Sequence, residues 1–181
     1  MDHSHTAEHH EHAHRFMPKY GLRDYLPLIV IVLVALVSAL TGQWPLAKRD
    51  GSTLMRQFMG NFLVIFAMFK LFDLPGFADG FQKYDLIAKR FRPYALVYPF
   101  IELALGLAYQ ANFSTVTTNT ILLVVMTIGA IGVLTALRNG LDVACACLGT
   151  MLKMPLSTVA VVEDVGMAAM AAIMLLSTAM R

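Results

Sequence analysis

Charged residues are scarce in this chain. Only 14% of its 181 residues are Asp, Glu, Lys or Arg, and 57% are hydrophobic. A soluble domain has roughly 25% charged residues, and a mean hydropathy of +0.63 points the same way. So few charges cannot cover the surface of a soluble protein of this size. The composition indicates an integral membrane protein and excludes an intrinsically disordered chain.

Cysteine and histidine are also restricted. The chain has only two cysteines, which excludes a disulfide-rich secreted scaffold. All its histidines precede Arg15, so no zinc–His or His–Asp–Ser site can form within the bilayer. The net charge is +2, and the basic residues lie in short loops rather than in one contiguous patch. No nucleotide-binding glycine motif is present. We therefore expect no nucleic-acid partner.

Long apolar runs define the predicted architecture. Each run falls within the range of roughly 17–25 residues that a transmembrane helix needs. The runs predict five transmembrane helices, over 25–42, 54–72, 93–110, 116–137 and 158–180. We read Pro75 and Gly76 as part of a loop between the second and third of these helices. The predicted fold is an all-α membrane protein, a bundle of five transmembrane helices surrounded by membrane lipid.

Three regions and one orientation follow from this pattern. Residues 1–24 are predicted to be a His-rich disordered cytoplasmic tail, residues 25–42 an extra N-terminal transmembrane helix, and residues 54–180 a four-helix membrane domain. Ten Lys and Arg residues fall on the side of the N-terminus and four on the other side. Because cytoplasmic loops carry the excess of Lys and Arg, we predict a cytoplasmic N-terminus and an outer C-terminus.

The Cys145-Ala146-Cys147 segment is the clearest candidate site. Two thiols this close together can form a strained, easily reduced disulfide, which suits thiol–disulfide exchange. The same pair could hold Cu(I) or another soft metal. A third interpretation treats Cys145 and Cys147 as small buried residues of an Ala-rich stretch.

The N-terminal tail is a second candidate site, for metal ions. Imidazole nitrogens bind Zn, Ni, Co or Cu, and residues 2–14 of the tail contain no large apolar residue around which to fold. A polar tail that binds metal only incidentally, or an engineered tag, would look similar. The candidate ligands are His3, His5, His9, His10, His12 and His14.

Ionisable residues within the apolar runs form a third group. Lys70 and Asp73 lie where the second helix leaves the bilayer, and we expect Lys70 to snorkel and to pair with Asp73. Glu102 lies inside the third helix and should point into the bundle, with Lys70 as its partner. Alternatively, Glu102 forms part of a proton or ion pathway. Glu163 and Asp164 are read as acidic residues that favour the positive end of the last helix.

Several of these pieces resemble the MauE/DoxX family of membrane proteins, related to the methylamine utilisation protein MauE. The resemblance covers Phe58 to Leu176 and rests on the order of the pieces more than on any one of them. The pieces are Phe69–Asp73 with Pro75 and Phe77, Tyr84–Ile87, Pro99–Gly106, and Arg138 with Gly140 before Cys145–Gly149. The resemblance implies a four-helix core in a bacterial inner (plasma) membrane and a redox-associated role, such as disulfide formation or maturation of a partner protein.

Together these observations favour a MauE-like protein that uses Cys145 and Cys147 as a thiol–disulfide oxidoreductase. Its partner would be a thioredoxin-like or periplasmic redox protein. The alternative is a metal-handling membrane protein, in which the His-rich tail collects Cu, Zn or Ni and the two thiols pass it on. A purely structural subunit of a membrane complex is a third interpretation. No cofactor is certain from the sequence.

Overall fold

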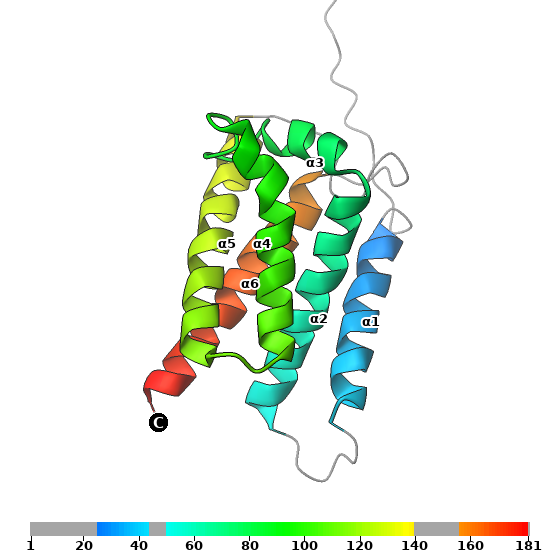
Figure 1. The fold of residues 1–181 in the computed structure, drawn as a ribbon, viewed down its shortest axis with the longest axis vertical. Helices are drawn as coiled ribbons and strands as arrows, with labels where there is room; N and C mark the ends of the chain where they lie inside the picture. The colour runs from blue at the N-terminus through cyan, green and yellow to red at the C-terminus, as the bar shows by residue number, and fades with distance from the viewer. Residues whose placement is uncertain (1–24, 44–49, 140–155, 181) are drawn as a thin grey trace, which may run out of the picture.

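The computed structural model describes residues 25–43, 50–139 and 156–180, and every regular element in these ranges is a helix (Figure 1). The helices are α1 (Leu26–Thr41), α2 (Gly51–Phe72), α3 (Leu74–Phe81), α4 (Arg92–Gln110), α5 (Thr115–Arg138) and α6 (Leu156–Ala179). The prediction of an all-helical protein is confirmed for this part of the chain.

The helices have the properties of a multi-pass membrane protein. α2, α5 and α6 are long and apolar enough to cross a membrane, and α1 is a shorter apolar helix of 16 residues. Large apolar side chains point outward along the helices: Leu33, Val124 and Leu176 are each more than half exposed. Such side chains fit contact with lipid tails rather than with water. The predicted number of five spans is not confirmed.

Two helix pairs build the bundle. α2 packs along α4 and α5 packs along α6, while α1 lies against the outer side of α2. Short α3 lies across one end of the bundle, where α2 ends and α4 and α6 begin (Figure 1). This end is called the α3 end below. α5 also ends there, so the end of α5 and the start of α6 lie at the same end of the bundle (Figure 1).

Capping residues explain where α2 and α3 begin. Asp50 caps α2 by accepting a hydrogen bond from the backbone N–H of Thr53. Hydrogen bonds from the side chains of Ser52 and Thr53 lower the pKa of Asp50 to about 2. Asp73 ends α2 and caps α3 by accepting from the N–H of Gly76. The predicted loop at Pro75 and Gly76 is therefore wrong, because a proline in the first helical turn starts a helix as readily as it marks a loop.

Stacked aromatic rings fill the core near the α3 end. The ring centroids of Phe62 and Phe66 on α2 lie 4.4 Å apart, and those of Phe77 and Phe81 on α3 lie 5.0 Å apart. The ring of Tyr98 on α4 is tilted against that of Phe81, with the ring centroids 4.6 Å apart. All five side chains are buried. Three of them, Phe66, Phe77 and Tyr98, lie around Lys70, the one buried lysine of the described residues.

Candidate functional site: a buried ion cluster

Lys70 points into the bundle from the last turn of α2. Its side chain is 3% exposed, and its Nζ donates to Glu102 Oε1 at 2.5 Å and to Glu163 Oε1 at 2.6 Å. The ammonium group therefore connects α2 to α4 and to α6. The expectation that Lys70 snorkels is wrong, because two buried carboxylates draw the ammonium inward. Asp73, its expected partner, lies exposed at the junction of α2 and α3.

Glu102 occupies the position predicted for it. It points into the bundle from α4, contacts Lys70 and is 0% exposed. Only one of its oxygens is satisfied: Oε2 is buried and has no hydrogen-bond partner among the described residues. An ionised carboxylate with an unpaired oxygen in an apolar interior is costly.

Glu163 and Asp164 bring a third and a fourth ionisable group to the same region. Both are buried, at 2% and 5% exposed, and neither lies in the first turn of α6. The interpretation that they favour the helix dipole is therefore wrong. Asp164 interacts electrostatically with Glu163, with Lys70 and with Asp85. Their position inside an apolar run is the signal that could have identified them as buried groups.

Aromatic faces complete the surroundings of the ammonium group. Lys70 Nζ lies 5.3 Å from the ring centroid of Tyr98, 5.6 Å from that of Phe77 and 5.9 Å from that of Phe66. The negative face of an aromatic ring attracts a cation at these distances. Residues of α2, α3, α4 and α6 thus surround the Lys70 ammonium with two carboxylates and three aromatic rings.

Asp85 is a further buried carboxyl, in the segment between α3 and α4. It is 0% exposed, and its Oδ1 accepts from the backbone N–H groups of Ile87 at 2.9 Å and Ala88 at 2.8 Å. Oδ2 has no partner among the described residues. Burial raises the pKa of Asp85 above its usual range, against the opposing effect of the two N–H groups.

The chemistry available to this group is acid–base chemistry. Glu102, Glu163 and Asp164 can each bind and release a proton, and the Lys70 ammonium supplies one positive charge to the three carboxyls. The Lys70 ammonium already occupies the position between Glu102 Oε1 and Glu163 Oε1 that another cation would need. We refer to Lys70, Glu102, Glu163 and Asp164 as the ion cluster.

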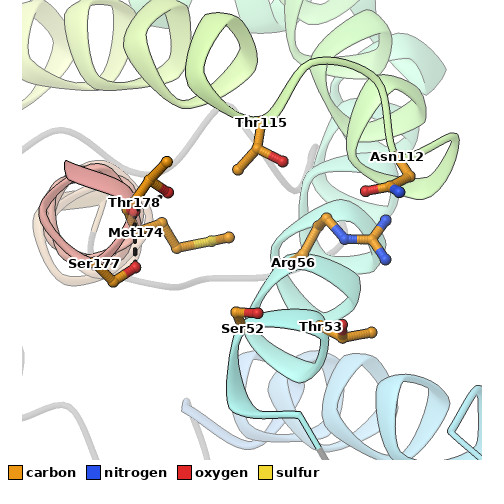
Figure 2. A pocket seen from close by; sticks show the side chains of 8 residues that line it. All are labelled: Ser52, Thr53, Arg56, Asn112, Thr115, Met174, Ser177 and Thr178. Atoms are coloured by element: carbon orange, nitrogen blue, oxygen red, sulfur yellow. Dashed lines mark hydrogen bonds between the residues drawn. The ribbon is translucent and has the colours of Figure 1, made fainter. Parts of the chain in front are cut away.

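A polar cavity of about 310 Å³ lies at the opposite end of the bundle (Figure 2). Arg56 enters it from α2, and its Nη1 donates to the carbonyl oxygen of Tyr109 at 2.8 Å. The hydroxyl groups of Ser52 and Thr53 donate to Asp50, and those of Ser177 and Thr178 donate to the carbonyl of Met174. These donors are thus already engaged within the protein. The cavity does not reach the ion cluster, because Lys70 lies at the other end of α2.

The remaining candidates lie outside the described residues. These are Cys145 and Cys147 of the predicted thiol site and the six histidines of the predicted metal site. Within residues 25–43, 50–139 and 156–180, no three His, Cys, Asp or Glu residues are arranged to hold a metal ion.

Comparison with known proteins agrees with the resemblance noted in the sequence. No curated protein and no solved structure matches the chain significantly. The family described as "Methylamine utilisation protein MauE" matches residues 48–177, which include all of α2 to α5, most of α6 and every member of the ion cluster. The chain is thus a membrane protein that belongs to the MauE family.

Proposed function

We propose that this protein supports thiol–disulfide chemistry, or the maturation of a redox partner protein, through Cys145 and Cys147. The observation that carries this proposal is the position of the two cysteines. They are the only ones in the chain, lie one residue apart and precede α6 in a membrane protein of the MauE family. Closely spaced thiols are suited to alternate between dithiol and disulfide.

The exchange would proceed in two steps. One thiolate attacks a disulfide of the partner, which forms a mixed disulfide and releases a partner thiolate. The second cysteine then attacks its neighbour's sulfur, which releases the other partner thiolate. The partner gains two electrons and two protons, and Cys145 and Cys147 become a disulfide. In the opposite direction the partner's dithiol is oxidised. The partner fits a thioredoxin-like redox protein, or a periplasmic one if the two thiols lie on the outer side of the membrane.

The membrane arrangement belongs to the same proposal. We infer five spans, α1, α2, α4, α5 and α6, in a bacterial inner membrane, with the N-terminal tail in the cytoplasm. The excess of Lys and Arg on the N-terminal side supports this orientation. The α3 end would then face the cytoplasm, where thiols are kept reduced. This placement favours a dithiol that donates electrons or holds a soft metal over one that oxidises a client.

Metal handling is the second candidate function. Six histidines before Arg15 and two neighbouring thiols provide ligands for Cu, Zn or Ni. In this case the tail would collect the ion and Cys145 and Cys147 would pass it on. The two functions differ in their need for the tail, because thiol–disulfide exchange requires only the two sulfurs.

Cysteine substitution separates the two functions. We expect Cys145→Ser and Cys147→Ser to abolish exchange with the partner, and one of the two variants to accumulate a mixed disulfide, because its resolving thiol is missing. Ala146→Ser is the matched control and should retain exchange, as should deletion of residues 2–14. Non-reducing electrophoresis of membranes after acid quenching measures the mixed disulfide. Stoichiometric Cu(I) or Zn binding that needs both cysteines, with no mixed disulfide in either variant, would replace this function by metal transfer.

A further inference from the structure

The ion cluster contains more acidic groups than its cation can balance. Three carboxyl groups and one ammonium group are all 5% exposed or less. With every group ionised, the cluster would carry two uncompensated negative charges inside a membrane domain. Burying an uncompensated charge costs several kcal/mol per ion, and bilayer-embedded ionisable groups are rare for the same reason. The described residues supply no second cation to the cluster, so a bound cation would neutralise the excess negative charge.

The geometry identifies the proton as that cation. Glu102 Oε1 and Glu163 Oε1 both lie within 2.6 Å of the same nitrogen, so the position between them is occupied by Lys70. Glu102 Oε2 is fully buried and has no hydrogen-bond partner among the described residues. A proton on a carboxyl group removes the charge without needing additional space or further ligands.

We propose that Lys70, Glu102, Glu163 and Asp164 form a proton-binding site in the membrane domain, which exchanges protons with the solution at the α3 end through Asp85. In each binding step a carboxylate takes up one proton and becomes a carboxylic acid, and the charge of the cluster rises by one. Release reverses the step. Two protons make the cluster neutral. This inference does not depend on the cysteines.

Close packing on α5 supports the exchange route. A Cβ atom placed on Gly129 would lie 2.7 Å from Asp164 Oδ2, and one placed on Gly132 would lie 3.1 Å from the Cα of Asp85. These glycines are one helical turn apart on the same face of α5. Asp164 and Asp85 thus lie against neighbouring turns. Leu86, the next residue, is 45% exposed, so the chain reaches the surface one residue after the buried Asp85.

Other ionisable groups near this site are few among the described residues. The ring of Tyr98 faces the Lys70 ammonium. Tyr94 interacts electrostatically with Asp85, Glu102 and Asp164. Tyr84 stacks edge-on against Phe81, and α3 contributes the exposed Asp79, which pairs with Arg92. Lys89 interacts electrostatically with Asp85. None of these described groups places a second cation within the cluster.

Infrared spectroscopy of the full-length protein tests this proposal. A protonated carboxyl group has a C=O stretch that an ionised carboxylate lacks. In a detergent without ester groups, we expect this band in the wild-type protein at neutral pH and its loss at alkaline pH. The absence of the band at neutral pH in the wild-type protein would overturn the proposal, whether or not any variant folds.

Variants assign the band to residues. The combination Glu102→Gln, Glu163→Gln and Asp164→Asn should lose most of the band, whereas Asp79→Asn, which changes an exposed carboxylate, should leave it unchanged. A band of full intensity in the combined variant would overturn the assignment. Asp85→Asn should keep the cluster's contribution to the band and slow its shift after transfer to D₂O. An unchanged rate would overturn the route through Asp85.

Discussion

Replacing Lys70 by Met is expected to lower the free energy of unfolding by about 3–5 kcal/mol, the usual loss when one partner of a buried ion pair is removed. Methionine has nearly the same length as the lysine side chain, so the aromatic rings around it keep their packing. The change removes the charge that Glu102 and Glu163 share within 2.6 Å. Unfolding of the purified protein by heat or by a denaturing detergent measures the loss.

Lys83→Met is the matched control for this variant. Lys83 is exposed in the segment after α3, and substitutions at such positions usually change stability by about 0.5 kcal/mol or less. Equal losses from the two substitutions would show that the ammonium group of Lys70 does not neutralise the buried carboxylates.

Gly106→Leu is expected to destabilise the protein by about 1–3 kcal/mol, the typical cost of overpacking a tight interior contact. A Cβ atom on Gly106 would lie 2.8 Å from Val64 Cγ2 and 3.0 Å from the backbone nitrogen of Val64. The second contact involves main chain, so α2 and α4 would have to separate. Small residues allow this close approach between membrane helices. Because Lys70 and Glu102 lie on these two helices, their 2.5 Å contact should weaken as well.

Gly166→Ala, on α6, is the control for the glycine substitution. A Cβ atom at this position would meet nothing within 4 Å, and alanine is the better helix former by about 1 kcal/mol. We expect unchanged or increased stability in the same unfolding assay. A loss at Gly166 as large as that at Gly106 would mean that helix approach does not explain the effect.

The sequence predicted the long helices because apolar runs of this length have one stable form in lipid. The predicted range 116–137 lies within α5, which spans Thr115–Arg138. The short helix α3 was missed, since proline and glycine after Asp73 are also typical of a loop. A run of apolar residues does not determine how the ends of the helix are capped or which helices pack together.

The ion cluster was only partly predictable. Glu102 was predicted to contact Lys70 because a buried carboxylate needs a partner. The same reasoning was not applied to Glu163 and Asp164, whose place near the start of a helix offered a simpler explanation. Whether such residues face solvent or the core depends on the rotation of α6 against its neighbours. That rotation comes from packing and is not visible in the local sequence.

The central claim is that Lys70, Glu102 and Glu163 act as one interacting unit, and a mutant cycle tests it most directly. Lys70→Met is compared in the wild-type protein and in a background that carries Glu102→Gln and Glu163→Gln. If the unit exists, the loss caused by Lys70→Met should shrink by more than about 1 kcal/mol in that background, because the two side chains that contact the ammonium group no longer carry a charge. Losses that agree within about 0.5 kcal/mol in both backgrounds would contradict the claim.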